Sequence, residues 1–317
     1  MDITVYNVYS KYLKERFGEK VYKLPISLPL TCPNRDGCVG TGGCIFCGEE
    51  GGSFENLPNF IPVKEQLIRN KEYIEKRYKA KKFISYFQNF TNTYLPLEKF
   101  KSYIEESIID GIVGISISTR PDAINDRYLD FLAHIRDKYN LEITIELGLQ
   151  TVNYHTLKRI NRGHSLAEFI DGVIRNKNYG IRTCAHLILN LPWDNMEDVI
   201  ENAKILSALR VEEVKLHALY IVANTQLGRM YQKGEIRLIS KEEYQERVIT
   251  FLEYLHEDIV VQRIIGRAPE ENTLFVNWNE SWWKIRDEIV AQMEERKTKQ
   301  GIKCDYLNGK ALKRFNN

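Results

Sequence analysis

Apolar and polar residues alternate along the chain in blocks that predict strands and helices in turn. Short runs rich in β-branched and aromatic residues indicate buried strands, whereas the stretches between them repeat apolar residues every three or four positions, as amphipathic helices do. The runs predict strands at Tyr22–Ser27, Phe83–Phe87, Gly114–Ser118, Ile143–Gly148, Thr183–Leu189 and Glu213–Ile221. The stretches between them predict helices at Val63–Tyr78, Leu97–Ile109, Asp126–Lys138, Tyr154–Arg159, Leu166–Asn178 and Met196–Leu209. Strands that alternate with helices form parallel sheets, so we expect an α/β fold, a partial (β/α)6 TIM-like barrel whose curved sheet is open on one side.

The pattern becomes helix-rich towards the C-terminus. Helices are expected at Lys241–His256 and Ser281–Thr298, on either side of a short strand at Ile259–Ile265. We therefore expect two parts, a barrel core over residues 1–230 and a C-terminal extension over residues 231–317 that faces the substrate. Ligands of such folds bind at the carboxyl ends of the strands, so polar residues that directly follow a strand are the first candidates for a site.

Length and charge narrow the class of protein. The 317 residues suffice for one large α/β domain with an extension. The opening stretch, MDITVYNVYSKYLKERFGEK, lacks the apolar core of a secretory signal, and no later stretch is long and apolar enough to span a bilayer, so we expect a soluble, cytoplasmic protein. The formal net charge is +2, so any signal for nucleic-acid binding must be local.

Four of the six cysteines lie close together, which suggests a metal site. Cys32, Cys38, Cys44 and Cys47 fall on one glycine-rich loop after the first predicted strand, while the other two stand alone. A secreted disulfide scaffold would carry denser and more evenly spaced cysteines. Thiolates are the usual ligands of iron–sulfur clusters, and glycine lets a loop bend around such a cluster. The loop therefore predicts an iron–sulfur site.

Two other interpretations of the loop stay open. Four thiolates also suit a closed zinc site, although zinc ribbons usually bring two C-x-x-C pairs, whereas this loop has one pair, Cys44 and Cys47, and two widely spaced single cysteines. A redox-active C-x-x-C normally opens a helix in a thioredoxin-like unit and needs no thiols upstream. The spacing favours the iron–sulfur site over both. Cys184 and Cys304 are too isolated to hold a second cluster.

Several motifs taken together resemble one family. In chain order they are CPNRDG at 32–37, GGCIFC at 42–47, YFQNFTNTY at 86–94, STRPD at 118–122, ELGLQT at 146–151 and HLILNLP at 186–192. They resemble segments of the radical S-adenosylmethionine (SAM) proteins of the YhcC/YtqA type, relatives of the Elongator catalytic subunit. The resemblance covers residues 1–230 well and the tail more loosely, through Gln262-Arg263-Ile264.

The resemblance implies a [4Fe–4S] cluster held by Cys32, Cys44 and Cys47. Cys38 departs from the family pattern and is interpreted as a bystander thiol, with an alternative ligand of a damaged cluster as the other interpretation. Three thiolates leave one iron open. The resemblance implies that SAM binds there and is cleaved to a 5′-deoxyadenosyl radical, which carries the chemistry, so no catalytic side chain is assigned. The implied fold is a partial barrel of the radical SAM type with a helix-rich C-terminal extension.

Resemblance and position at strand ends together suggest which side chains contact SAM. The expected contacts are Phe46, Gln88, Asn89, Ser118, Arg120, Glu146 and Gln150. Phe46 precedes the last cysteine and is expected beside the adenine, with an ordinary core aromatic as the alternative. Glu146 and Gln150 end the fourth strand and offer acceptors to the ribose hydroxyls. Arg120 suits the SAM carboxylate, with a surface salt bridge as the alternative.

Two local stretches are basic enough to suggest RNA. Residues 64–82 carry eight Lys or Arg against three Glu, and residues 284–314 are net basic, with Trp282 and Trp283 just before them. Such surfaces follow phosphates and stack bases. An amphipathic helix with a solvated basic face gives the same pattern, and on the sequence alone that interpretation is favoured.

The resemblance makes tRNA the expected substrate, because Elongator-like enzymes act on the wobble uridine of tRNA. It implies hydrogen abstraction from the 5-carboxymethylaminomethyl side chain of that uridine and loss of the carboxymethyl carbon unit, which leaves 5-aminomethyluridine. Arg263 and Arg267, on either side of Gly266, are expected to face the substrate. The expected partners are tRNA and an electron donor such as a flavodoxin or ferredoxin. Two alternatives stay open, a radical SAM enzyme that acts on a small molecule or peptide and a non-catalytic metal-cluster protein that binds nucleic acid.

Overall fold

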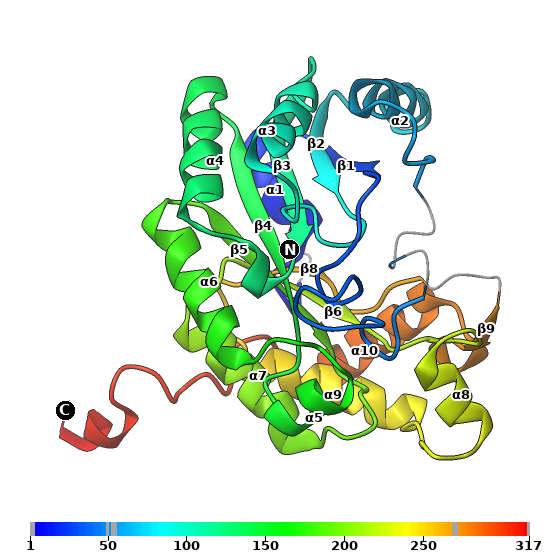
Figure 1. The fold of residues 1–317 in the computed structure, drawn as a ribbon. Helices are drawn as coiled ribbons and strands as arrows, with labels where there is room; N and C mark the ends of the chain where they lie inside the picture. The colour runs from blue at the N-terminus through cyan, green and yellow to red at the C-terminus, as the bar shows by residue number, and fades with distance from the viewer. Residues whose placement is uncertain (1–3, 49–50, 52–55, 268–271, 316–317) are drawn as a thin grey trace.

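The computed structural model describes residues 4–48, 51, 56–267 and 272–315. Its centre is a sheet of seven parallel strands in the order β1-β2-β3-β4-β5-β6-β8. The strands are β1 (Val21–Ile26), β2 (Lys82–Phe87), β3 (Ile112–Thr119), β4 (Glu142–Gln150), β5 (Arg182–Ile188), β6 (Glu213–His217) and β8 (Val260–Arg263). The sheet curls, and helices lie along its outer side (Figure 1). The expected partial α/β barrel is confirmed.

Most of the helices connect consecutive strands. They are α1 (Tyr9–Phe17), α2 (Val63–Tyr78), α3 (Leu97–Glu106), α4 (Asp126–Tyr139), α5 (Tyr154–Arg159), α6 (Leu166–Asn178), α7 (Met196–Ala208), α8 (Gln226–Gln232), α9 (Lys241–Tyr254) and α10 (Trp282–Glu295). Short 3₁₀ turns are η1 (Pro121–Ala123), η2 (Asn277–Asn279) and η3 (Lys310–Phe315). The eight helices expected from the sequence are all present, with small differences at their ends. None of the described helices is both long and apolar enough to cross a bilayer.

The prediction for the sixth strand is wrong at its C-terminal end, because β6 stops at His217 and not at Ile221. The expected run Glu213–Ile221 breaks after β6, because the N–H of Leu219 donates to the side-chain oxygen of Asn190, 2.6 Å away, instead of joining the strand ladder. The residues that follow form β7 (Ile221–Val222), which pairs antiparallel with β9 (Thr273–Phe275) in a second, two-stranded sheet.

The strand expected in the tail is confirmed as β8, and it belongs to the main sheet. It pairs in parallel with β6, so a segment from the expected C-terminal extension completes the barrel. The N-terminal segment covers its other edge. The N–H of Val261 donates to the carbonyl of Asn7 at 2.8 Å, and Val8 forms a parallel bridge with Val261.

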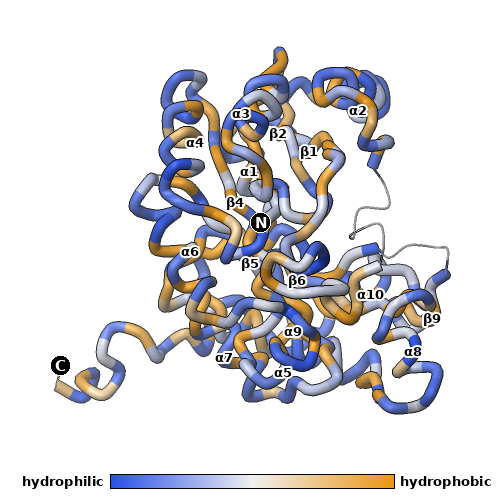
Figure 2. Tube along the Cα trace, in the orientation of Figure 1, coloured by the Kyte–Doolittle hydropathy of each residue, from blue (hydrophilic) through white to orange (hydrophobic). Residues whose placement is uncertain are grey.

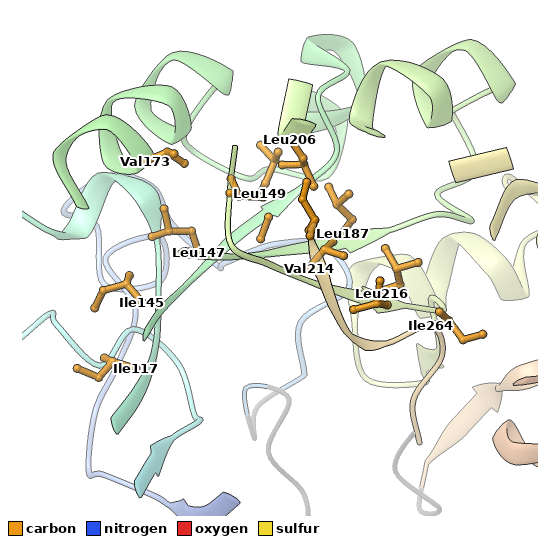
Figure 3. Packing of buried hydrophobic residues seen from close by; sticks show 14 of the residues in the cluster. Ile117, Ile145, Leu147, Leu149, Val173, Leu187, Leu206, Val214, Leu216 and Ile264 are labelled. Carbon is orange, nitrogen blue, oxygen red and sulfur yellow. The ribbon is translucent and has the colours of Figure 1, made fainter. Parts of the chain in front are cut away.

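The two faces of the sheet differ in chemistry because alternate residues of a strand point to opposite faces. On β4, Ile145 and Leu147 pack outward into the core beneath the helices, where Figure 3 shows Leu147 with Val173 of α6. The residues between them, such as Thr144 and Glu146, point into the barrel. Figure 2 shows polar and apolar positions alternating along the outer helices, as expected for helices with one buried side. The apolar core therefore lies outside the sheet, and the interior of the barrel is free to carry polar side chains.

Candidate active site

A cavity of about 660 Å³ opens at the carboxyl ends of the strands. Residues at or just past the strand ends line it, in strand order Gln88, Arg120, Gln150, Ile188, His217 and Arg263. The N-terminal segment adds Tyr9, and α10 adds Trp282. This is where parallel α/β folds bind their ligands, and the volume is within the usual range for a ligand site.

The cysteine loop forms one wall of the cavity. Cys32, Cys44 and Cys47 all line it, whereas Cys38 is exposed to solvent. The structure therefore separates the four clustered thiols into a group of three that faces the cavity and one that does not.

Glycine and asparagine shape this loop. Gly43 has a φ of +77°, and a Cβ there would lie 3.0 Å from the Cγ of Arg35, so a larger residue would be strained and would displace that side chain. The N–H of Gly43 donates to the carbonyl of Asn34 at 2.8 Å. Asn34 is buried, and its Nδ2 donates to the carbonyl of Asn161 at 2.6 Å. The loop is thereby fixed to the segment that follows α5.

Three side chains donate hydrogen bonds to the sulfurs. Nη2 of Arg35 lies 3.1 Å from Sγ of Cys47. Nη1 of Arg162 lies 3.4 Å from Sγ of Cys44, and Nδ2 of Asn34 lies 3.7 Å from the same sulfur. Burial raises the pKa of the Cys47 thiol and the neighbouring Cys44 raises it further, while Arg35 opposes both. Cationic donors stabilise sulfur that carries negative charge, as metal-bound thiolates do, so the three thiols and their donors fit a [4Fe–4S] cluster.

Arg162 is a site residue that the sequence analysis missed. Its guanidinium is buried, and its Nη2 donates to the carbonyl of Gly148 at 2.6 Å, at the end of β4. The segment is held on its other side by Ser165, whose side chain forms a capping box with Glu168 at the start of α6. Arg162 lies in a short connection between two helices, where no periodic pattern marks a residue as functional.

Six of the seven side chains expected to contact SAM line the cavity. They are Phe46, Gln88, Ser118, Arg120, Glu146 and Gln150. Asn89 is not among the residues that line it. Its Oδ1 accepts from the N–H of Leu28 at 3.1 Å, and its Nδ2 donates to the carbonyl of the same residue at 2.8 Å. Asn89 therefore connects the end of β2 to the segment after β1.

Arg120 forms the salt bridge that was the alternative to a SAM contact, although the bridge is buried and not on the surface. Its Nε and Nη2 donate to the two carboxylate oxygens of Asp122 at 2.8 and 2.7 Å, and its Nη1 donates to the carbonyl of Arg162 at 2.8 Å. Burial opposes the charge, but Asp122 outweighs it and raises the pKa of Arg120. These contacts place Arg120 as a support for the Arg162 segment, and its expected contact with SAM stays a prediction.

Glu146 lies on the floor of the cavity, the part formed by inward-facing side chains of β4, β5, β6 and β8. Its Oε1 accepts from Lys23, and its Oε2 accepts from Lys215 at 3.1 Å and from Nε2 of His186 at 2.8 Å. Burial opposes ionisation, but Lys215 and Lys23 outweigh it and hold the pKa of Glu146 well below its usual range. The carboxylate is therefore a buried counter-ion, and its expected contact with a ribose stays a prediction.

A directed chain of hydrogen bonds crosses the floor from β8 to β4. Nη2 of Arg263 lies 2.7 Å from Nδ1 of His217, and Nε2 of His217 lies 3.3 Å from Nδ1 of His186. A guanidinium only donates, so each imidazole accepts at Nδ1 and donates at Nε2, and the chain ends on the Glu146 carboxylate. Burial lowers the pKa of His186 to about 4 and, together with Arg263, holds the pKa of His217 well below its usual range. Both imidazoles are therefore neutral, as the chain requires.

One further group of side chains has the composition of a metal site. Glu146, Cys184 and His186 offer ligand atoms within 4.8 Å of one another. A cation there would face the ammonium groups of Lys23 and Lys215, which already bind the same carboxylate. This group is therefore an ion-pair network, and the cysteine loop is the candidate metal site.

The basic stretches lie mostly outside the cavity, although Arg286 of the second stretch lines it together with Trp282. In α2, Leu67 is buried while Tyr73 is exposed, and Arg77 donates to the Tyr73 hydroxyl at 2.7 Å. Trp282 lines the cavity, whereas Trp283 is exposed. The helix is amphipathic, as the favoured interpretation expects, and its solvated side also carries the aromatic and cationic groups that RNA binding would use.

Comparison with known proteins decides the family. Residues 35–206 match the radical SAM superfamily, and residues 211–295 match the Radical_SAM C-terminal domain. The chain belongs to the radical SAM superfamily. As a radical SAM enzyme it uses a [4Fe–4S] cluster and SAM, which excludes the zinc interpretation and the non-catalytic alternative.

Similar proteins within the radical SAM superfamily align with different shares of this sequence. Uncharacterized protein YtqA of Bacillus subtilis is 36% identical over 299 residues, which cover 93% of this chain and 92% of that protein. A tRNA uridine(34) acetyltransferase of Methanocaldococcus jannaschii is 26% identical over 212 residues, which cover 64% of this chain and 36% of that protein. The solved structure of an N-terminally truncated Elp3 of Methanocaldococcus infernus has a TM-score of 0.69 at 17% identity, and the match covers 88% of this chain and 64% of that one. At that identity, the likeness of the structures shows the radical SAM fold alone.

Proposed function

We propose that the protein modifies the wobble uridine of tRNA, converting 5-carboxymethylaminomethyluridine to 5-aminomethyluridine. The observation that carries the proposal is the alignment of 64% of this chain with a tRNA uridine(34) acetyltransferase. That relative is named for the same nucleotide, and the aligned part includes less than half of its length. The uridine-34 specificity is therefore proposed to be shared, and the acetyl transfer is not.

The cysteine loop would hold the cluster through Cys32, Cys44 and Cys47, with Arg35 and Arg162 donating to the sulfurs. When bound, the cluster and SAM supply a 5′-deoxyadenosyl radical, which takes hydrogen from the carboxymethylamino side chain of the uridine. The resulting carbon radical next to the nitrogen would lose one electron, back to the oxidised cluster, to give an imine. Water would then hydrolyse the imine to the aminomethyl group and glyoxylate.

The rest of the cavity wall positions the reactants. Phe46 offers a ring face to the adenine, and Gln88, Ser118 and Gln150 offer amide and hydroxyl groups to the polar parts of SAM. Trp282, at the α10 side of the cavity, is placed to stack on a nucleobase. A flavodoxin or ferredoxin is proposed as the electron donor.

Nucleoside analysis of tRNA tests the reaction. We expect tRNA from cells that lack the gene to accumulate 5-carboxymethylaminomethyluridine and to lose 5-aminomethyluridine, measured by mass spectrometry of digested tRNA. The anaerobically reconstituted enzyme should convert that tRNA in vitro, and the Cys32→Ala variant should not. Unchanged levels of both nucleosides in the deletion strain would reject the proposal.

A binding assay separates tRNA from the small-molecule or peptide alternative. Retention of tRNA in a gel shift should weaken steeply as salt rises, because phosphate contacts release counter-ions. SAM cleavage that a free nucleoside or peptide stimulates, without any retention of tRNA, would favour the alternative.

A further inference from the structure

The cavity carries more positive than negative charge. Among the described residues of its wall, Glu146 is the one carboxylate, whereas several arginines and a lysine line it. Arg120 is neutralised by Asp122, and Lys215 shares Glu146 with Lys23. The ammonium and sulfonium of SAM outweigh its one carboxylate, and the cluster thiolates would face Arg35 and Arg162, so neither accounts for the charge of Arg263.

Among the described residues, neither Arg162 nor Arg263 forms a salt bridge, but Arg162 donates to a cysteine sulfur and a carbonyl, whereas Arg263 has a single hydrogen-bond partner. Its Nη2 donates to the neutral His217, and its Nε is buried with no hydrogen-bond partner among the described residues. Its Nη1 makes no hydrogen bond within the described part of the chain. A buried N–H without a partner is costly, so the half-buried side chain is arranged for a partner that the described part of the protein does not supply.

The position of the guanidinium is fixed by its surroundings. Arg263 is the last residue of β8, and the next residue, Ile264, packs in the core cluster that includes Leu216 of β6 (Figure 3). A Cβ at Gly266 would lie 2.8 Å from the Cζ of Arg263, so glycine at that position leaves room for the guanidinium. The hydrogen bond to His217 sets the orientation of the guanidinium plane of Arg263. The group is therefore pre-organised for bidentate recognition of an anion.

We propose that Arg263 binds a carboxylate of the substrate, and that Lys215 on the neighbouring strand adds to the attraction. This inference rests on the proposed function, in which the carboxylate is the end of the carboxymethylaminomethyl group. The His217, His186 and Glu146 chain holds the guanidinium in place from behind, and Gly266 keeps its other face clear. Arg263 is thus a specificity determinant that distinguishes an acidic side chain from a neutral one.

The position in the sheet favours the substrate over SAM as the source of the carboxylate. The thiols are contacted by Arg162, which follows β4, whereas Arg263 ends β8, three strands further along the sheet order. Among the described residues, Arg263 makes no hydrogen bond to the cysteine loop, whose sulfurs accept from Asn34, Arg35 and Arg162.

Calorimetric binding to the cluster-loaded enzyme tests the assignment. The ligands are the nucleoside 5-carboxymethylaminomethyluridine, its methyl ester and SAM, and the variants are Arg263→Gln, Arg263→Lys and, as a matched control, the exposed Arg296→Gln. We expect the wild type and the control to bind the acid about tenfold or more tighter than the ester, since the ester loses a charge-assisted bidentate pair. Arg263→Gln should bind both ligands equally, Arg263→Lys should be intermediate, and all variants should bind SAM alike.

The outcomes separate this inference from the proposed function. If Arg263→Gln keeps the preference for the acid, or if it weakens SAM binding instead, the assignment is wrong. If the wild type binds neither nucleoside, thermal unfolding in acetate is compared with unfolding in acetamide. Stabilisation by acetate alone, lost in Arg263→Gln, would keep the carboxylate site and reject the uridine substrate. If acetate does not stabilise the wild type either, both the carboxylate site at Arg263 and the uridine substrate are rejected.

Discussion

Cys32 and Cys38 differ in the surroundings of their side chains, although six positions separate them in one loop. Cys32 lines the cavity, and Cys38 is exposed. We expect Cys38→Ala to keep the iron and sulfide content and the charge-transfer absorbance of the reconstituted enzyme, and Cys32→Ala to lose both, because the proposed set of three thiolate ligands includes Cys32 and not Cys38. If Cys38→Ala loses iron and Cys32→Ala keeps it, then Cys38 is the cluster ligand and Cys32 is the bystander.

Arg162 should tune the cluster as well as hold the loop. Its Nη1 donates to Sγ of Cys44, and hydrogen bonds to cluster sulfurs favour the reduced, more negative state. We expect Arg162→Gln to shift the reduction potential of the cluster to a more negative value, measured by redox titration with electron paramagnetic resonance. Arg162→Lys, which keeps the charge, should shift it less. An unchanged potential in Arg162→Gln with normal iron content would leave Arg162 a purely structural role.

Glu146 neutralises two buried ammonium groups, so its removal should be costly. We expect Glu146→Gln to lower the free energy of unfolding by about 3–5 kcal/mol, because it leaves Lys23 and Lys215 without their carboxylate. The double variant Glu146→Gln, Lys215→Met should recover part of that loss, since it removes one of the unpaired charges. Urea denaturation followed by circular dichroism measures both. Equal stability of the single and double variants would contradict the ion-pair account.

At the scale of the elements, the sequence patterns locate the strands and helices of the barrel but not the small second sheet. Strands β1 to β5 form long apolar runs, and α2 to α7 repeat apolar residues at helical spacing, so both are visible. β7 has two residues and β9 has three, which is too short for any periodicity. α1 has Leu13 as its one buried residue, so its apolar side is too narrow to stand out.

The sequence likewise predicts only part of the candidate site that the structure shows. The cysteines and the cavity-facing residues that are expected to contact SAM follow from spacing, resemblance and position after a strand. The floor follows from a pattern that is visible in the sequence, because Glu213, Lys215 and His217 alternate with apolar residues along β6, and alternate residues share a face. That pattern marks a polar barrel interior. The partners of these side chains come from β2, β4, β5 and β8, so only the fold reveals the network.

The histidines at the ends of β5 and β6 make stability depend on pH. His186 has a pKa lowered from 6.5 to about 4, and that of His217 is also lowered, in both cases mainly by burial. Below pH 6.5 the unfolded chain binds protons that the folded protein excludes. The free energy of unfolding should therefore fall between pH 6.5 and 4, by up to about 1.4 kcal/mol per pH unit for each histidine.

Urea midpoints measured at intervals from pH 7.5 to pH 5 test this dependence. The variant His186→Gln should show a shallower fall than the wild type, because one of the excluded protons is gone. A wild-type stability that stays constant across this range would show that the two imidazoles titrate normally in the folded protein.

At the scale of the whole molecule, the N-terminal and C-terminal parts of the chain are joined at β8. Gln300 is buried, and its Nε2 donates to the carbonyls of His256 and Ile259, each at 2.8 Å, while its Oε1 accepts from the N–H of Asn7 at 2.9 Å. These bonds link the segment before α1 to both sides of the connection that leads into β8. The barrel is therefore closed by residues from the two ends of the chain and does not depend on the first 230 residues alone.

Two truncations distinguish the parts of the tail that the barrel needs. A chain that stops after Asp258 loses β8 and Gln300, so it exposes the edge of β6 and leaves the N-terminal segment without its partners. We expect it to be insoluble or to bind no iron. A chain that stops after Asn308 loses only η3, which has no buried residue and projects away from the barrel in Figure 1, so its melting temperature should stay within about 2 °C of the wild type. A folded, iron-binding protein from the shorter chain would show that the seventh strand is an addition to a barrel that is already complete.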